Sequence, residues 1–452
     1  MLNSSISLIQ TYKKIFKLAL PILAMQFSQM SMGIVDTIMA GQASLNDLAA
    51  VAIGASIWLP IFLLILGILT AVTPTVSHLN GANQLHKVEH VVRQTIWIGI
   101  VISLFAIFLL NHMDSVLDIM QVSKITQPIV IGYLYAVSWG ILGVSLFFIL
   151  RCLNEGLANA VPVMIVGLIG LLINIFFNYL LIFGNWGFPA LGGAGAGWAT
   201  SISHWLMAIM LLVYIINAKL FNNIRIFKFD FRIDLNEIMS LFKLGLPIGI
   251  AYFVEGSIFS VIALFIASLG TFVVASHQIA LNIATFVFIL PLSLSIAMTI
   301  LVGHAKGANN PLQLKRIVYA GFSISIFQAV IIAILILLFA SDIPTLYTQE
   351  AKVINLASHL MLFAAIYQLP DAIQLCGSAT LRGLKDTAIP MLFSIVSFWI
   401  IGFPLGYFLA LSNHIVAAMG ASGFWIGLIC GLCLSSVLQS LRLRIMMKKL
   451  ND

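Results

Sequence analysis

Apolar segments of membrane-spanning length recur along the whole chain, and they constrain its fold more than any other feature. About 20 apolar residues cross the hydrocarbon layer as a helix, whereas barrel strands need only about half as many. Only 8% of the residues are charged and the mean hydropathy is +1.09, far outside the range of soluble globular proteins. The sequence therefore predicts an all-α polytopic membrane protein with twelve transmembrane helices. The predicted spans are Leu18–Ala40, Ala49–Val72, Ile96–Asn111, Pro128–Leu150, Val161–Phe183, Ala194–Ile216, Leu244–Leu269, Ile279–Leu301, Ile317–Ala340, Leu356–Thr380, Ile389–Leu411 and Ala417–Leu441.

The lysines and arginines fall almost entirely in alternate loops. Of the 22 basic residues, 20 lie on one side of the predicted spans, and only Lys124 and Lys352 lie on the other. Basic loops are retained in the cytoplasm, so both termini are expected there. The net charge of +7 then reflects membrane topology, and we expect no nucleic-acid partner.

Two short motifs occur twice at one spacing. FKLALP at 16–21 is followed by FKLGLP at 242–247, and HLNGAN at 78–83 by HAKGAN at 304–309, both 226 residues later. A constant offset across two spans indicates an internal duplication.

The duplication predicts two parallel repeats of six helices, because an even number of spans returns the chain to its starting side. We expect an N-terminal lobe over 1–218, a charged cytoplasmic linker over 219–243 and a C-terminal lobe over 244–452. Two parallel repeats around a shared axis are typical of carriers. A channel is the alternative, although no filter-like sequence such as TVGYG is present.

Three of the fifteen acidic residues lie within predicted spans: Asp36, Glu255 and Asp371. A carboxylate in hydrocarbon costs at least ~2.5–3.5 kcal/mol, so such a residue is by default functional. The alternative is an acid buried neutral and hydrogen-bonded or, for Asp36, one at a span end. At ~1.5 Å per residue, Glu255 lies ~18 Å past Lys243 and Asp371 lies ~16 Å before Arg382. The two acids are therefore expected at one depth.

The residues before Asp371 are suited to a cation. Pro370 lacks an N–H and frees the carbonyl of Ile366, while Tyr367 lies one turn before Asp371 on the same helix face. A carbonyl, a phenol and the carboxylates of Asp371 and Glu255 provide the oxygen ligands that hard cations such as Na⁺ prefer. The alternative is a simple helix kink.

Amide side chains occur in pairs one turn apart. Asn174 and Asn178 share one face of span five, and Gln278 and Asn282 share one face of span eight. These four residues are candidates for a substrate or proton site. Hydrogen bonding between helices is the alternative for each pair.

No enzyme signature is supported. HKVEH at 86–90 fits the H-x-x-E-H zinc pattern, but its repeat copy at 312–316 has none of the three residues, and no GxSxG or Walker motif occurs. We therefore expect a protein that is not an enzyme and has no cofactor.

Several of these segments together resemble the multidrug and toxic compound extrusion (MATE) family, in particular its NorM-like branch. They are VDTIMAG around Asp36, YFVEG around Glu255, YQLPD ending at Asp371 and the two GAN motifs. The resemblance covers nearly the whole chain. It implies a V-shaped carrier of two six-helix lobes that exports cationic, amphipathic drugs in exchange for Na⁺ or H⁺.

The resemblance also implies roles for single residues. It assigns Tyr367, Glu255 and Asp371 to a coupling-ion site in the second lobe. It assigns Asp36, together with Asn174 and Asn178, to a proton or cation and drug site in the first lobe. Some relatives carry an acid where Asn178 falls.

From this reading we expect a secondary multidrug transporter that contributes to antibiotic resistance. Its partners would be small cationic drugs and the lipid bilayer, and it would act as a monomer in the inner membrane of a bacterium. The alternative transporter is a flippase for lipid-linked oligosaccharide, which would carry a more cationic cavity; no arginine or lysine is evident in the middle of a span. An intramembrane hydrolase is a third possibility, opposed by the missing motifs.

Overall fold

The computed structural model describes residues 7–120, 122–222, 224, 232–413 and 417–449, and these residues form helices and connecting turns without any strand. Within this part of the chain, twelve helical segments are long and apolar enough to cross a membrane. The predicted all-α class and the number of spans are therefore confirmed. Several segments exceed the membrane thickness: the first has 36 residues and is about 54 Å long.

Some spans consist of more than one helical element. In the first half, α2 is followed by α3 after a short turn, and the second half contains a π-helical segment, η5, between α13 and α14. The first-half helices are α1 (Leu8–Ala43), α2 (Leu45–Leu69), α3 (Val72–Gly81), α4 (Val88–Leu110), α5 (Asp114–Ile119), α6 (Gln127–Gly156), α7 (Val161–Leu181) and α8 (Gly193–Asn217). The second-half elements are α9 (Leu235–Ala267), α10 (Thr271–Gly307), α11 (Pro311–Leu338), α12 (Ala351–Gly383), α13 (Ala388–Ser394), η5 (Ile395–Gly402), α14 (Phe403–Leu411) and α15 (Ala421–Lys448).

The chain divides into two compact units whose boundaries fall inside helices. One unit comprises Leu20–Gly249, and the other comprises Met1–Ala19 with Ile250–Asp452. The first turns of α1 thus belong with the second half of the chain, and the first turns of α9 with the first half. The predicted lobes and their linker stay a prediction, and residues 225–231 of that linker lie outside the described residues.

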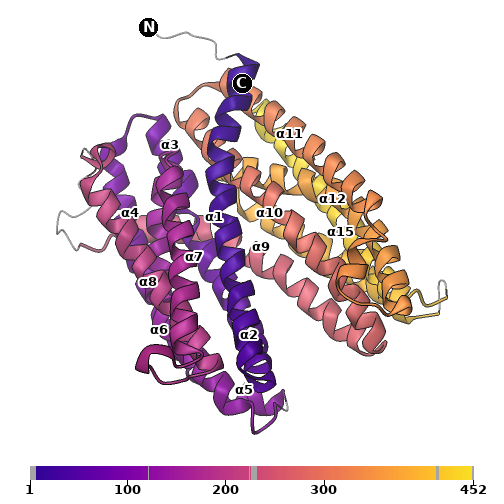
Figure 1. Ribbon diagram of the computed structural model, residues 1–452. Coiled ribbons are helices and arrows are strands. Elements are labelled where there is room, and N and C mark those ends of the chain that lie inside the picture. The colour runs from indigo at the N-terminus through magenta and orange to yellow at the C-terminus, as the bar shows by residue number, and fades with distance from the viewer. Residues whose placement is uncertain (1–6, 121, 223, 225–231, 414–416, 450–452) are drawn as a thin grey trace. The chain divides into compact units, whose positions relative to one another are not determined.

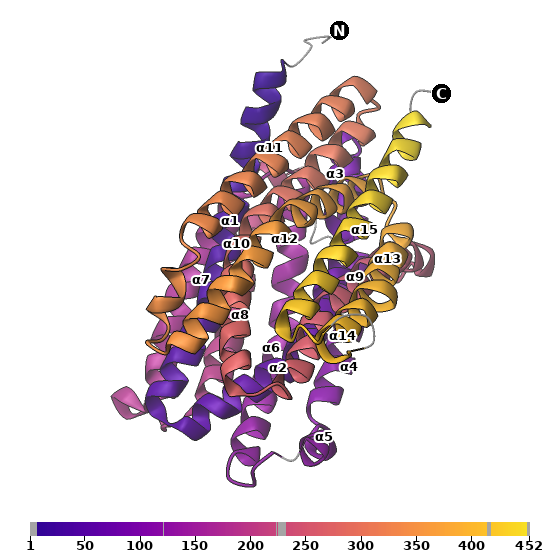
Figure 2. The same ribbon diagram turned by 90° about the vertical axis from the view of Figure 1, so that its right-hand side faces the viewer.

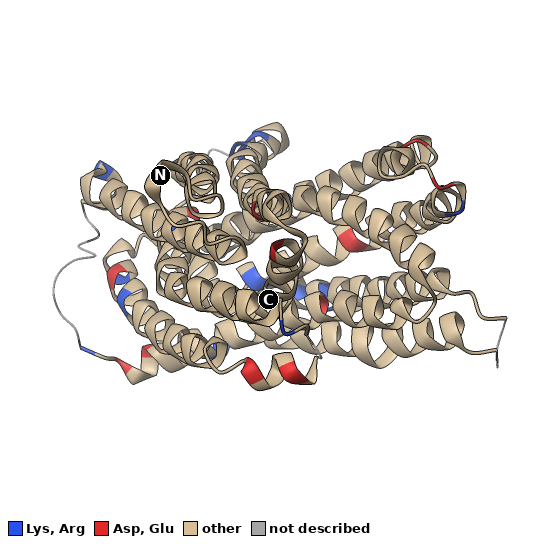
Figure 3. Ribbon diagram, turned by 60° about the horizontal axis from the view of Figure 1, so that its bottom comes forward, with Lys and Arg blue, Asp and Glu red and all other residues tan. Residues whose placement is uncertain are grey.

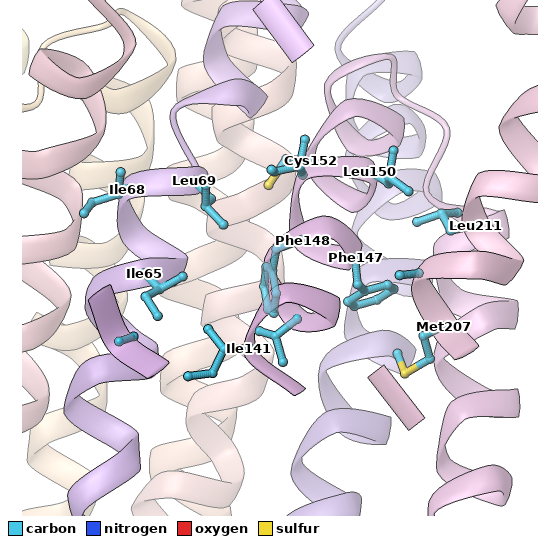
Figure 4. Packing of buried hydrophobic residues seen from close by; sticks show 14 of the residues in the cluster. Ile65, Ile68, Leu69, Ile141, Phe147, Phe148, Leu150, Cys152, Met207 and Leu211 are labelled. Atoms are coloured by element: carbon cyan, nitrogen blue, oxygen red, sulfur yellow. The ribbon is translucent and has the colours of Figure 1, made fainter. Parts of the chain in front are cut away.

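In the unit Leu20–Gly249, α6 lies between α2 and α8 (Figure 4). Phe148 of α6 belongs to the same apolar cluster as Ile65 of α2, and Phe147 points towards Met207 and Leu211 of α8. All these side chains are buried, and together they fill the space between the three helices. α6 is therefore the central helix of the unit. Because lipid provides no hydrophobic force between helices, the close packing of these side chains holds the three helices together.

In the other unit, α10, α12 and α15 lie side by side (Figures 1 and 2). Small residues allow the close approach of α15 to its neighbours: Gly427 lies against the backbone of Gly402 and Gly406. Near the other end of the unit, Ile15 of α1 packs into a cluster with Met298 and Val302 of α10. Both kinds of packing are typical of membrane helices.

The duplication is also visible in the backbone. Each half has a residue with positive φ at the end of its second span, another after its fourth span and a glycine before its sixth. A positive φ is unusual for residues other than glycine, so its recurrence at matching positions indicates repeated turns. The pairs are Asn83 and Asn309, Ala158 and Lys385, and Gly192 and Gly420.

We expect Gly427→Ala to lower the thermal unfolding temperature of the purified protein. A Cβ at this position would overlap backbone atoms of Gly402 and Gly406, and such overpacking costs about 1–3 kcal/mol. Gly33→Ala is the matched control, because a Cβ there meets nothing within 4 Å and alanine favours a helix. Equal unfolding temperatures of the two variants would contradict the packing described here.

Candidate functional site

Charged residues are scarce along the helices (Figure 3). The three acids that the sequence places in spans lie on α1, α9 and α12: Asp36 and Asp371 are buried and Glu255 is half-buried. Asp36 lies in the unit Leu20–Gly249, while Glu255 and Asp371 lie in the other unit. The two units therefore contain separate carboxylate sites.

Asp36 is held by neutral donors from two other helices. Its Oδ1 accepts hydrogen bonds from Nδ2 of Asn178 at 2.6 Å and Nδ2 of Asn174 at 3.1 Å. Its Oδ2 accepts a bond from Oγ1 of Thr200 at 2.7 Å. The structure thus brings together the three residues predicted for the first site and adds Thr200 of α8, which the sequence analysis missed.

The amide oxygens at this site add further acceptors. Oδ1 of Asn174 accepts a bond from Asn178, whereas Oδ1 of Asn178 is buried and has no hydrogen-bond partner among the described residues. A buried acceptor without a donor is unfavourable, so the arrangement suits a visiting cation, proton or water. Carboxylate and amide oxygens are ligands of that kind.

Glu255 is also held by neutral donors. Its Oε1 accepts hydrogen bonds from Nε2 of Gln374 on α12 and Oγ of Ser394 on α13, each at 2.9 Å. Neither donor was identified from the sequence. Ser394 directly precedes the π-helical η5, and π-helical turns are frequent at functional sites.

Asp371 lies in the same electrostatic environment as Glu255. Tyr367 lies one turn before Asp371 on α12, and Gln374, whose amide donates to Glu255, lies three residues after Asp371 on the same helix. The helix α12 continues through Pro370 without a break. The three residues predicted to form the ion site are therefore close in space, while their role stays a prediction.

The Tyr367 ring has an aromatic neighbour on its other side. It packs edge-on against Trp425 of α15, with ring centroids 6.2 Å apart. The Trp425 indole N–H donates to Nδ1 of His277 at 3.3 Å. All three side chains are buried, so the orientation of Tyr367 is fixed by packing.

The second amide pair lies apart from these hydrogen bonds. Gln278 donates to Asn282 at 3.1 Å, and both residues are on an exposed face of α10. None of the hydrogen bonds described for the carboxylates involves either residue. Their proposed part in substrate or proton binding stays a prediction.

Two arginines lie deeper in the helices than expected. The predicted fourth and tenth spans end at Leu150 and Thr380, just before Arg151 and Arg382, but these arginines lie within α6 and α12 and are 3% and 5% exposed. Both helices extend past the predicted end of the apolar run; Arg151 pairs there with Glu155, and Arg382 bonds to the Tyr252 hydroxyl.

Among the described residues, a histidine of the motif at 86–90 contacts an aspartate instead of forming a metal site. Nε2 of His90 lies 3.1 Å from Oδ2 of Asp234, and Oδ1 of Asp234 accepts the backbone N–H groups of Glu237 and Asn236. The Glu237 N–H, with His90 and Asn236, holds the pKa of Asp234 below its usual value. No group of three or more metal-binding side chains occurs in the described part of the chain.

Comparison with known proteins gives matches over the full chain. The MatE family model matches residues 21–180 and 247–408, two stretches that begin at the same offset of 226 as the repeats. Multidrug resistance protein MdtK of Yersinia pseudotuberculosis serotype O:1b (strain IP 31758) is 41% identical over 438 residues, which are 97% of this chain and 96% of the relative. The MdtK protein of Yersinia enterocolitica serotype O:8 has the same identity and coverage.

Solved structures share the fold. The crystal structure of the eukaryotic MATE transporter AtDTX14 superposes with a TM-score of 0.86 at 20% identity, covering 98% of each chain. An outward-facing multidrug resistance MATE family transporter gives a TM-score of 0.88 at 18% identity, covering 100% of this chain and 99% of the other. A transporter of the MOP superfamily from Pyrococcus furiosus gives the same TM-score and identity over all of both chains.

Proposed function

Because this chain belongs to the MatE family, we propose that it is a secondary active transporter that exports cationic, amphipathic drugs in exchange for Na⁺ or H⁺. Members of this family are transporters rather than enzymes, and they need no cofactor. The names of the relatives, which describe multidrug resistance, support the substrate class. The twelve spanning helices and the bacterial relatives support a multi-pass protein of the inner membrane.

The observation that carries the proposal is a carboxylate in each unit whose hydrogen bonds come from neutral groups. Asp36 accepts its bonds from two amides and a hydroxyl, and Glu255 from one amide and one hydroxyl. A buried carboxylate needs a counter-charge, and an incoming cation or proton supplies it. Sites of this kind suit a carrier whose cargo and coupling ion are both cations.

Exchange follows from competition for these carboxylates. A drug cation and a coupling ion that need the same ionised acid displace each other. If the ion-loaded and drug-loaded proteins prefer opposite-facing states, binding of one drives the release of the other. Shifting a two-state equilibrium from 1:99 to 99:1 needs about 5.5 kcal/mol of differential affinity.

We assign the coupling ion to Glu255, Asp371 and Tyr367, which provide oxygen ligands for Na⁺. Protons are expected to compete with Na⁺ for the same oxygens. We assign drug or proton binding to Asp36 with Asn174, Asn178 and the newly identified Thr200. Of the 22 basic residues, 20 lie on one side of the predicted spans, and this supports cytoplasmic termini. We propose that the protein acts as a monomer.

Everted membrane vesicles test this function. With Na⁺ loaded in the lumen and diluted outside, or with an acidified lumen, we expect accumulation of a fluorescent cationic drug that stops when the gradient is dissipated. Vesicles without the protein are the control. Accumulation driven by only one gradient identifies the coupling ion. Ion currents without drug exchange would contradict the proposal and indicate a channel, and drug accumulation without any gradient would contradict ion coupling.

A further inference from the structure

The two repeats each contain a buried arginine, but these arginines have different partners. Each guanidinium nitrogen of Arg151 in the first repeat donates a hydrogen bond. Its Nε donates to Glu155 at 2.7 Å, and Nη1 and Nη2 donate to Gln29 and Gln26 at 2.8 and 2.7 Å. Glu155 lies one turn later on the same helix, so it neutralises Arg151 locally. This cluster has a net charge of zero.

Arg382 of the second repeat has no such partner on its own helix. The residue four positions later, Asp386, lies 2.7 Å from Arg442 in an ion pair. Nη1 of Arg382 bonds to the Tyr252 hydroxyl, and its guanidinium lies over the Tyr252 ring. Its Nε is buried without a hydrogen-bond partner among the described residues. The positive charge of Arg382 is thus not matched by Asp386.

Arg382 corresponds in the repeat to Glu155, as Lys385 does to Ala158. The repeat offset shows which residues of α9 correspond to the two glutamines that bind Arg151. Adding 226 to Gln26 gives Tyr252, and adding 226 to Gln29 gives Glu255. The second repeat therefore has an acid at the position where the first has an amide bonded to its arginine. Tyr252, which bonds to Arg382, lies three residues before Glu255 on the same face of α9, so Arg382 bonds to the helix that carries Glu255, at a position less than one turn from it.

We propose that Arg382 is a tethered counter-ion of the coupling-ion site, limiting it to one monovalent cation. This inference rests on the proposed function, because it concerns the site formed by Glu255 and Asp371. Two ionised carboxylates carry two negative charges, and Arg382 leaves one of them uncompensated. A single Na⁺ or proton then neutralises the site. The coupling ion must also bind weakly enough to be released in every transport cycle.

Removal of Arg382 tests the proposal by direct binding. Purified wild type and Arg382→Gln are unfolded by heat in NaCl, with choline chloride keeping the ionic strength constant, since a ligand that binds the folded state stabilises it. We expect half-maximal stabilisation of Arg382→Gln at a Na⁺ concentration at least tenfold lower than for wild type. We also expect Ca²⁺ to stabilise the variant alone. A smaller Na⁺ shift or an absent Ca²⁺ response overturns the proposal.

Two further variants separate charge from packing. Arg382→Lys keeps the charge and is expected to remain within threefold of the wild-type Na⁺ midpoint. The double variant Arg151→Gln/Glu155→Gln removes the buried ion pair of the first repeat, and we expect an unchanged midpoint. A midpoint shifted tenfold in either of these proteins would overturn the proposal.

Charge rescue decides the question if Arg382→Gln does not fold. Glu255→Gln leaves Asp371 as the one carboxylate of the site, so that with Arg382 the site has no net negative charge and Na⁺ stabilisation should be lost. Glu255→Gln/Arg382→Gln restores one negative charge, and Na⁺ stabilisation should return. Its failure to return overturns the proposal.

Transport is measured separately in the vesicles described above. Wild-type export with an unshifted Arg382→Gln midpoint refutes the counter-ion role alone. Absent export with the expected shift refutes the drug-export function alone.

Discussion

Asp371→Asn is expected to reduce ion-driven drug efflux at least about 100-fold, to the level of vesicles without the protein. The substitution keeps the shape of the side chain and removes its charge, so the site formed with Glu255 and Tyr367 loses a negative ligand for the coupling ion. Folding and membrane insertion should be retained, because a neutral amide is cheaper to bury than a carboxylate. Drug accumulation under Na⁺ and pH gradients measures the effect.

The control for this variant is Asp342→Asn, the same substitution at an exposed residue of the same unit. It should export at the wild-type rate. Wild-type export by Asp371→Asn, with equal amounts of protein in the membrane, would refute the assignment of the ion site.

The second large effect is expected at the other carboxylate. Asp36→Asn should abolish drug export, because the two asparagines and the threonine would then surround an amide with no charge to attract a cation or to bind a proton. Thr200→Val should have a smaller effect, about tenfold, since it removes one of three hydrogen bonds and leaves the acid in place. Drug efflux and equilibrium drug binding to the purified protein measure both variants.

Drug binding distinguishes the two sites from each other. We expect Asp36→Asn to lose binding of a cationic drug and to keep the Na⁺-dependent stabilisation of the unit that contains Glu255. The reverse pattern, with drug binding intact and Na⁺ stabilisation lost, would exchange the roles assigned to the two carboxylates.

The spans were predictable because lipid leaves little choice of structure. An apolar run of sufficient length must form a helix there, so hydropathy determined the number of spans and the fold class. Helix ends were harder to locate. Arg382 looked like a loop residue because the sequence does not show that Tyr252 lies beside it in the folded protein.

The acids of the site were predictable for a related reason, since a carboxylate in a span is costly unless it has a function. Their hydroxyl partners were not. A serine or threonine in a helix commonly bonds to the carbonyl one turn before it, as Thr380 does with Cys376. Thr200 instead reaches another helix, and nothing in the local sequence distinguishes the two situations.

The spacing of the amide residues also did not show which pair contacts a carboxylate. Asn174 and Asn178 have the same separation as Gln278 and Asn282, yet only the first pair contacts a carboxylate. Helical spacing establishes that two residues share a face. The direction of that face depends on tertiary packing.

The unit boundaries inside α1 and α9 bear on the origin of the chain. A half-length ancestor with this arrangement would have left the opening turns of its first helix without a core in its own polypeptide. Two such molecules could have satisfied each other by exchanging those turns, as domain-swapped dimers do. Fusion of the two genes would then have made the exchange permanent within one polypeptide.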